Sequence, residues 1–360
     1  MIRFSHIVYE NEQNSSAKDQ LIIQFIVVNR SKAFAMSTLE INSKEFVKLK
    51  DKVILITGGS SGIGLGVVKL LLSIGARVTS VDLTAPPASE DFTSQSPTFT
   101  FEKCNVCDWK ALRSVFSRVV EREGRLDAVF ANAGNNPNTS RGAVRSRLMM
   151  RLRILELEGV NPRTRFIDDE IDPTDGQLKE PDLSCLETNL YGVISTVKLA
   201  VHHMRAREIQ GSIVITASVS SWTRFGAVDY TTSKHAVLGF MRGLLPHTSR
   251  LPVPIRINCI APNWTKSGLV TEEIVAPTGF DLSTPEDVAR SVGLLMTDKA
   301  RNGEVIFVDG GRYWEIGKTL EGDGVGRFVG PTMPPGTSDC THWEQYVEFC
   351  RRMNMALGIM

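Results

Sequence analysis

Residues 52–75 read KVILITGGSSGIGLGVVKLLLSIG, and this stretch decides the fold. The apolar run at its start is continuous, which is typical of a strand buried on both faces of a sheet. Apolar residues then recur at helical spacing from Leu65 to Leu72, and Gly75 is placed to end the helix. The stretch therefore predicts a buried strand, a glycine-rich turn and a helix.

The same alternation of β-branched runs and helical segments continues to about residue 311. Further strands are expected at 77–83, 98–106, 126–134, 211–218, 255–262 and 303–311, and helices at 108–124, 184–206, about 228–245 and 283–298. Thr284 is the expected N-cap of the last helix, and Pro246 is expected to end the helix before it. We predict an α/β fold, a Rossmann-like doubly wound parallel sheet in a single domain.

The composition excludes several classes of protein. A net charge of +1 gives no general attraction to nucleic acid or membranes. The apolar run at 21–28 is far too short to span a bilayer. Six cysteines without a pairing framework favour a reducing, cytoplasmic setting. Cys104 and Cys107 form a C-x-x-C that lacks a second ligand pair, so we expect no metal.

The turn TGGSSGIG at 57–64 lies where a dinucleotide loop is needed. A glycine-rich turn lets main-chain N–H groups approach a pyrophosphate at the start of the helix. An ordinary strand–helix turn would need one glycine rather than four. The expected contacts are Gly58, Ser60, Ser61, Gly62, Ile63 and Gly64.

Asp82 ends the second expected strand, 18 residues beyond Gly64. A carboxylate there accepts hydrogen bonds from the adenosine ribose and repels a 2′-phosphate. The loop also offers no Arg or Lys to such a phosphate, so we expect NAD rather than NADP. The ends of the third and fourth strands should add Asn105 and Val106 at the adenine, and Asn132, Ala133 and Gly134 beside the ribose.

Tyr230 and Lys234, in YTTSKH, stand at i and i+4 and so share one helix face. A free tyrosine has a pKa of about 10, and a nearby ammonium should lower the pKa of Tyr230. Ser218, at the end of the fifth strand, could hold the reacting oxygen while Tyr230 moves the proton. A Tyr–Lys pair on one helix face is usually exposed and without a function. This pair follows a nucleotide-binding loop in the sequence, which favours a catalytic role.

These motifs, T-G-x-x-x-G-x-G, N-A-G, Ser and Y-x-x-x-K, resemble those of the short-chain dehydrogenase/reductase family from about residue 51 to 311. The resemblance implies a catalytic tetrad of Asn189, Ser218, Tyr230 and Lys234. It makes Tyr230 the general acid/base, Ser218 the substrate-orienting donor and Lys234 a ligand of the nicotinamide ribose. Asn189 would support a water that relays the proton, and Thr265 would meet the nicotinamide carboxamide.

The resemblance also implies a function and a setting. Residues 166–205 are most similar to filamentous-fungal members, which suggests an NAD-dependent exchange between a secondary alcohol and a ketone of a polyketide or terpenoid. The alternative is a catalytically silent NAD-binding regulator, although such a protein would not need the whole tetrad. We expect a cytoplasmic homodimer or homotetramer with a small-molecule substrate and no nucleic-acid or membrane partner. Asn263 stands where the family has Gly. Asn is the residue that, after Gly, best tolerates a positive φ, so we expect cofactor binding to survive this difference.

Three segments lie outside the resemblance. Residues 1–50 form an N-terminal extension, of which 1–35 could be foreign because the chain from Met36 resembles a complete family start. Residues 312–360 form a C-terminal extension that should begin as a loop. Residues 141–165 carry seven arginines against two glutamates and interrupt the domain. This insertion is either a lid or translated intron sequence, and we favour the second.

Overall fold

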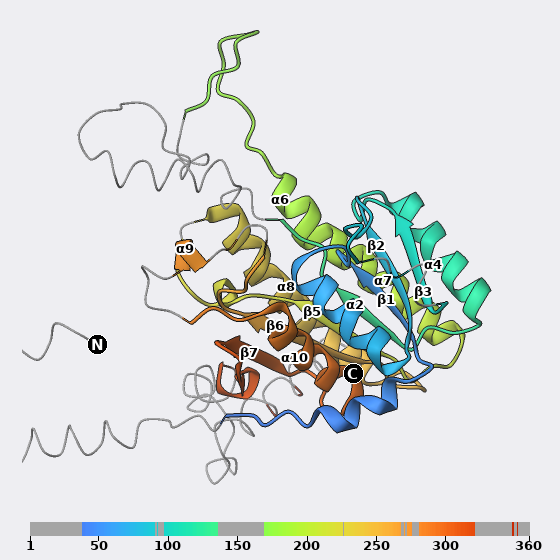
Figure 1. Ribbon diagram of the computed structural model, residues 1–360. Helices are drawn as coiled ribbons and strands as arrows, with labels where there is room; N and C mark the ends of the chain where they lie inside the picture. The colour runs from blue at the N-terminus through green and yellow to red at the C-terminus, as the bar shows by residue number, and fades with distance from the viewer. Residues whose placement is uncertain are drawn as a thin grey trace, which may run out of the picture. The chain divides into compact units, whose positions relative to one another are not determined.

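The computed structural model describes residues 38–90, 92, 97–135, 169–225, 227–267, 270, 272–275, 281–320, 348 and 351. The chain divides into two units, Met1–Thr38 and Leu39–Met360, and the fold below belongs to the second (Figure 1). The expected insertion at 141–165 and the expected foreign segment at 1–35 lie outside the described residues.

One sheet of eight strands, in the order β3-β2-β1-β4-β5-β6-β7-β8, organises this unit. The strands are β1 Val53–Thr57, β2 Arg77–Asp82, β3 Phe99–Lys103, β4 Ala128–Ala131, β5 Ser212–Thr216, β6 Arg256–Pro262, β7 Val305–Asp309 and β8 Arg312–Glu315. Neighbouring strands from β3 through β7 all run parallel. The prediction of a doubly wound α/β fold is confirmed.

The eighth strand was not expected. The sequence prediction has the C-terminal extension begin as a loop, whereas β8 pairs antiparallel with β7. Gly310 and Gly311 hold φ values of 53° and 74°, the two left-handed positions that a two-residue hairpin turn requires. Tyr313 of β8 is buried, so this strand completes the sheet edge instead of leaving it open.

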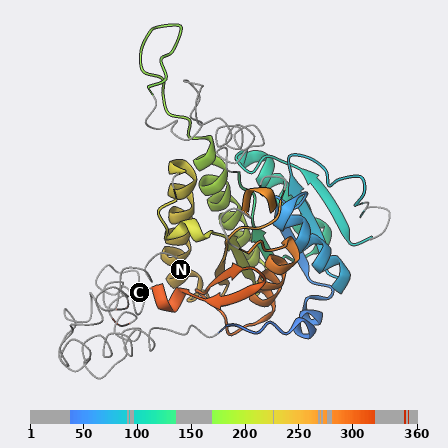
Figure 2. The same ribbon diagram turned by 60° about the vertical axis from the view of Figure 1, so that its left-hand side comes forward.

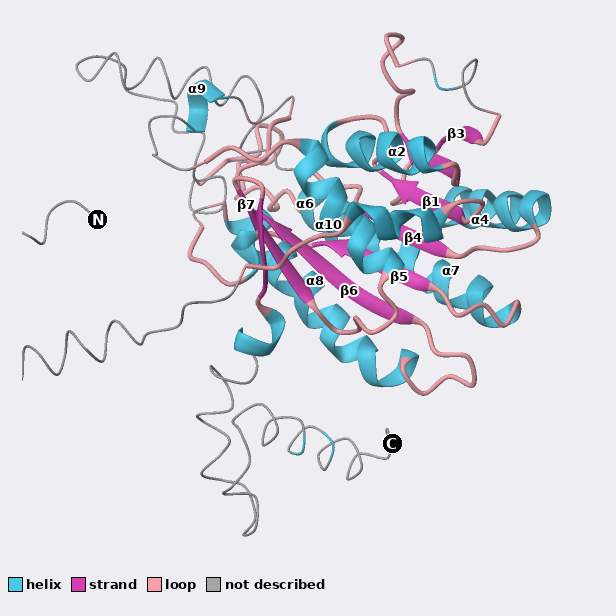
Figure 3. Ribbon diagram, turned by 60° about the horizontal axis from the view of Figure 1, so that its bottom comes forward, coloured by secondary structure: helices cyan, strands magenta, loops and turns pink. Residues whose placement is uncertain are grey.

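Helices cover both faces of the sheet (Figure 3). The helical segments are η1 Ser43–Leu49, α2 Gly62–Ile74, α4 Trp109–Glu123, α6 Ser184–Leu186, η3 Glu187–Tyr191, α7 Gly192–Ala206, η4 Val219–Ser221, α8 Val228–Thr248, α9 Glu272–Val275 and α10 Pro285–Thr297. α2 and α10 pack together and bury one cluster against the sheet, while α4, α7 and α8 cover the opposite face. Gly75 ends α2 in a left-handed conformation, and Thr284 caps α10, as predicted.

α8 differs from its expected length, because it runs through Pro246 to Thr248. A proline removes only its own N–H donor, and this one lies in the last turn, where few hydrogen bonds remain to be lost. The Ser249 N–H and hydroxyl both bond to the Leu245 carbonyl, which closes the helix past the proline.

The expected helix at 184–206 contains a π-helical turn, η3, between α6 and α7. Such wide turns are rare and occur often at functional sites. This one carries Asn189, whose side chain is completely buried.

Two further described segments, residues 39–50 and residues 169–183, lie before β1 and before α6. Residues 39–50, placed by the sequence analysis in the N-terminal extension, pack on the body, where the Phe46 ring of η1 lies against α10 at Gly293. Residues 169–183 project from the body before α6 and are held by a bridge between Ile171 and Leu178 (Figure 2). Among the helices in the described part of the chain, none is long and apolar enough to cross a membrane.

Candidate active site

A cavity of about 830 Å³ opens at the carboxyl ends of the strands. β1 and β4 are neighbours there, while the chain leaves β1 toward β2 and β4 toward β5, so this is the topological switch point where doubly wound sheets bind ligands. Of the predicted site residues, those lining the cavity are Gly58, Ser61, Gly62, Ile63, Asp82, Asn105, Val106, Asn132, Ala133, Gly134, Ser218, Tyr230, Lys234 and Thr265. Ser60, Gly64 and Asn189 lie behind its wall and act through other residues.

The glycine-rich loop brings the start of α2 to the cavity. Gly58 has a φ of 70°, and a Cβ there would lie 2.8 Å from the Ala133 Cα. A Cβ on Gly64 would lie 1.9 Å from the Gly58 carbonyl oxygen. The Ser61 side chain does not cap α2, and the first turn of α2 carries no acidic residue. The positive end of the helix dipole is therefore not neutralised by a side chain of the helix itself. This cradle fits the phosphates of a dinucleotide.

Asp82 is held in place by the same loop. Its carboxylate accepts the Ser60 N–H at 3.0 Å and the Leu83 N–H at 2.7 Å. Ser60 therefore orients the carboxylate from behind and does not line the cavity itself. Two main-chain donors leave the carboxylate further acceptor sites on the cavity side.

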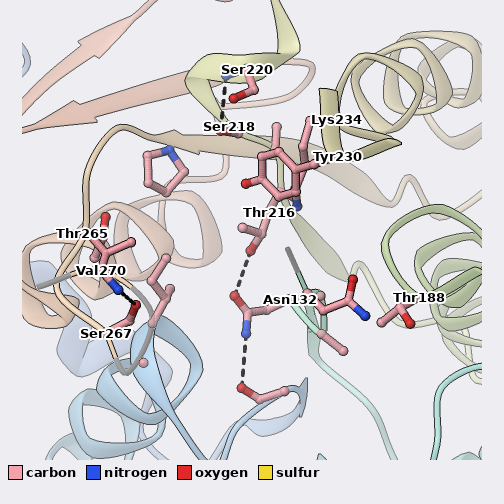
Figure 4. Close-up of a pocket in the computed structure, with 18 of the residues that line it drawn as sticks. Asn132, Thr188, Thr216, Ser218, Ser220, Tyr230, Lys234, Thr265, Ser267 and Val270 are labelled. Atoms are coloured by element: carbon pink, nitrogen blue, oxygen red, sulfur yellow. Dashed lines mark hydrogen bonds between the residues drawn. The ribbon is translucent and has the colours of Figure 1, made fainter. Parts of the chain in front are cut away.

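Asn132 connects three strands below the cavity (Figure 4). Its amide donates to the main-chain oxygens of Thr57 at 3.2 Å and Gly58 at 3.1 Å. Its Oδ1 accepts the Thr216 hydroxyl at 2.9 Å. The side chain thus joins the ends of β1 and β5 to its own strand and fixes the floor on which a cofactor would rest.

Ser218, Tyr230 and Lys234 come together at the other end of the cavity (Figure 4). Ser218 lies close enough to the Tyr230 hydroxyl to lower the pKa of that phenol. The Lys234 ammonium lies 5.6 Å from the Tyr230 ring centroid and donates to the Thr216 carbonyl at 2.8 Å. The structure therefore brings the three side chains named in the prediction together at one end of the cavity.

Burial changes the acidity of both groups on α8. It raises the pKa of Tyr230 above its ordinary value of 10, and the Ser218 side chain acts in the opposite direction. It also lowers the pKa of Lys234 to about 8. The sequence analysis expected Lys234 to lower the pKa of Tyr230, whereas in this arrangement Ser218 is the group that lowers it.

Asn189 is an anchor of the neighbouring chain. Its Oδ1 accepts the Asn135 N–H at 2.8 Å, and its amide donates to the Asn135 carbonyl at 2.8 Å and to Ser233 Oγ at 3.3 Å. Ser233 in turn donates to the Tyr230 carbonyl at 2.7 Å. The side chain therefore fixes the strand end that follows Gly134 relative to the helix of Tyr230.

The loop after β6 carries Thr265 to the cavity. Asn263 needs no positive φ, because the non-glycine residues with positive φ in the described chain are Asp51 and Glu208. It directly follows β6, with its N–H bonded to the Val308 carbonyl and its amide to Asp309 at 2.9 Å. The Thr265 hydroxyl donates back to the Asn263 carbonyl at 3.2 Å.

Several lining residues escaped the sequence analysis, namely Asn135, Thr188, Thr216, Phe225, Trp264, Val270, Phe307 and Asp309. Asn135 and Trp264 come within a few residues of the ends of β4 and β6, and Thr216 and Asp309 are the last residues of β5 and β7, so for these four a place at an expected strand end was the available signal. No sequence feature indicated that Phe307 lines the cavity, because an aromatic residue in a strand buried on both faces is expected to lie in the core.

The chain belongs to the short-chain dehydrogenase/reductase family. The family model for short chain dehydrogenases matches residues 52–160 and 174–276. Its oxidoreductases use NAD or NADP. The short-chain dehydrogenase/reductase ascJ of Acremonium egyptiacum is 37% identical over 79% of this chain and 87% of its own length. The short-chain dehydrogenase/reductase ATR7 of Stachybotrys chlorohalonatus is 33% identical over 74% of this chain and 73% of its own.

More distant relatives have the same architecture. The secoisolariciresinol dehydrogenase of Forsythia intermedia is 31% identical over 73% of this chain and 90% of its own length. The crystal structure of gox2181 superposes with a TM-score of 0.57 at 25% identity, over 75% of this chain and 98% of that chain. Within the described ranges, no group of three or more His, Cys, Asp or Glu is placed to hold a metal ion.

Proposed function

We propose that the protein is an NAD(H)-dependent dehydrogenase that interconverts a secondary alcohol and a ketone. The observation that carries the proposal is that Ser218, Tyr230 and Lys234 line the same cavity as the start of α2. One end of the cavity suits a dinucleotide phosphate, and the other holds a group that can move a proton. A hydride-transfer enzyme needs both.

The residues of the chemical end have separate tasks. In the oxidation direction, Tyr230 takes the proton of the substrate hydroxyl, and Ser218 donates a hydrogen bond to the substrate oxygen. When bound, the nicotinamide supplies the hydride acceptor, so that the alcohol loses a proton and a hydride and becomes a ketone. Oxidation starts from the Tyr230 phenolate, which becomes a neutral phenol as it takes the substrate proton. The Lys234 ammonium, held by the Thr216 carbonyl and 5.6 Å from the Tyr230 ring centroid, is the cation beside that phenolate.

The carboxylate of Asp82 supports NAD over NADP. It is fixed by two main-chain donors and lines the cavity, where it would accept the ribose hydroxyls and repel a 2′-phosphate. We expect NADH to bind more tightly than NADPH. Asp82→Asn should weaken NADH binding about tenfold, since a hydrogen bond to a charged group contributes about 1.5–3 kcal/mol.

Titration of both cofactors, followed by their fluorescence, measures this preference. Asp172→Asn is the matched control, because the Asp172 carboxylate also accepts two hydrogen bonds but lies on the projecting arm and does not line the cavity. Wild-type protein that binds NADPH as tightly as NADH would refute the cofactor assignment.

Catalysis itself is tested with Tyr230→Phe. We expect turnover of NAD⁺ with secondary alcohols in the wild type and none in the variant, while both bind NADH. The phenylalanine keeps the ring and removes only the proton-transferring hydroxyl. Binding without turnover in the wild type would instead favour a catalytically silent NAD-binding regulator.

The fungal origin of ascJ and ATR7 supports a place in fungal secondary metabolism, on a polyketide or terpenoid. The resemblance further supports a homodimer or homotetramer in the cytoplasm, with neither nucleic acid nor membrane as a partner. Sedimentation velocity of the purified protein measures the first of these, and a monomer at micromolar concentration would refute it.

A further inference from the structure

The reacting end of the cavity has an apolar wall that the mechanism above does not use. The wall consists of Val219, Phe225, Trp264, Val270 and Phe307. These residues come from the segment after β5, the loop before α8, the loop after β6, and β7. Figure 4 shows Val270 across the cavity from Tyr230. These side chains and Tyr230 line the same cavity.

Two of the aromatic rings are held in fixed positions. The Phe225 ring lies 6.2 Å from the Tyr230 ring at an angle of 78°, an edge-to-face contact beside the reacting hydroxyl. The Phe307 ring lies 6.0 Å from the Trp222 ring and 5.5 Å from the Trp314 ring. Because Trp222 and Trp314 stand behind the wall and do not line it, they hold Phe307 as a rigid surface.

The charges of the cavity constrain the ligand further. The charged residues among its described lining are Asp82, Lys234 and Asp309. Lys234 is bonded to the Thr216 carbonyl, and Asp309 accepts the Asn263 amide. The described wall thus offers no further cation to a substrate phosphate or carboxylate, and an unpaired anion is costly to bury.

We propose that the substrate is a neutral alcohol or ketone whose reacting carbon is bonded to a flat aromatic ring, and that Phe225 and Phe307 determine this specificity. The inference rests on the dehydrogenase function proposed above. Aromatic rings prefer offset or edge-to-face contacts with one another, and the two fixed phenylalanine rings offer such contacts on the reacting side. An aromatic ring held there presents the hydroxyl of the attached carbon to Tyr230 and Ser218.

The test uses the full-length enzyme with NAD⁺ and three alcohols: 1-tetralol with a fused aromatic ring, cyclohexanol, and the anionic 3-hydroxybutyrate. We expect kcat/KM to be highest for 1-tetralol and undetectable for 3-hydroxybutyrate. Phe307→Leu and Phe225→Leu keep an apolar side chain and remove the ring. Each should lower the ratio of kcat/KM for 1-tetralol to that for cyclohexanol about three- to tenfold, the range of an aromatic pair.

Phe101→Leu is the matched control, since Phe101 is a half-buried ring on a strand but does not line the cavity. Its ratio should equal that of the wild type. Unchanged ratios in both wall variants, or wild-type preference for cyclohexanol or 3-hydroxybutyrate, would overturn the inference. If Tyr230→Phe abolishes turnover but the wild type shows no preference for 1-tetralol, only this inference is defeated. If Tyr230→Phe keeps its turnover, the dehydrogenase mechanism is defeated.

Discussion

Replacing Asn189 with alanine tests whether its side chain holds the site together or acts in proton transfer. The substitution removes the two bonds to the Asn135 main chain and the bond to Ser233. Asn135 is exposed, so water can replace its lost partners and each bond contributes only about 0.5–1.5 kcal/mol. The three bonds together give a loss of about 2–4 kcal/mol in the free energy of unfolding. The midpoint of thermal unfolding should then fall by roughly 5–15 °C.

A matched control is available in Asn258, which is also completely buried and also joins two main-chain groups. Its Oδ1 accepts the Glu304 N–H at 2.9 Å, and its amide donates to the Arg301 carbonyl at 3.1 Å. We expect Asn258→Ala to lose a similar free energy of unfolding but to keep wild-type kcat and NADH affinity. Asn258 does not line the cavity.

Denaturant unfolding without cofactor measures both losses, and kcat measured at low temperature separates folding from activity. Asn189→Ala should lose kcat as well as stability, because Asn135 and the helix of Tyr230 are no longer held together. If Asn189→Ala matched wild-type stability within about 0.5 kcal/mol yet lost activity, the anchoring argument would be refuted and a direct role in proton transfer favoured.

Three shorter predictions concern other parts of the site. Burial lowers the pKa of Lys234 from 10.5 to about 8, so the unfolded chain binds more protons between these values and stability rises with pH across that window. The free energy of unfolding of the wild type should therefore gain about 2 kcal/mol over Lys234→Met between pH 8 and 10, and a parallel pair of pH curves would contradict this. Gly64→Ala would place its Cβ 1.9 Å from a main-chain oxygen of the same loop, so NADH binding should weaken at least about tenfold. Gly239→Ala, with nothing within 4 Å of its added Cβ, should bind NADH as the wild type does. Asn263→Gly restores the family's residue but loses the bond to Asp309, and we expect a higher KM for NAD⁺ rather than a lower one.

Local signals allowed much of the fold to be predicted. Four strands, β1, β4, β5 and β7, are almost entirely apolar runs with a polar residue or a glycine within a few positions of each end. The cofactor loop was readable for the same reason, since the constraint that excludes a Cβ at Gly58 and Gly64 acts within the strand–turn–helix itself and at the strand beside it.

Contacts between residues far apart in the sequence could not be predicted in this way. Asn189 looked like a member of a catalytic set, and only the fold revealed that its amide is occupied by a main-chain segment 54 positions away. The π-helical turn that carries it has no distinct sequence pattern. Pro246 predicted a helix end, but α8 continues to Thr248 and is closed by the C-cap Ser249, which bonds to the Leu245 carbonyl.

The sequence by itself therefore determined the class of fold, the loop for the cofactor phosphates and the Tyr230–Lys234 spacing, because each depends on residues within one or two helical turns. The tertiary structure decided which groups tune and surround them. Ser218 reaches Tyr230, and Phe307 faces the cavity between Trp222 and Trp314, only because the strands that carry them end at one edge of the sheet. Local periodicity carries no information about which distant strand ends will meet.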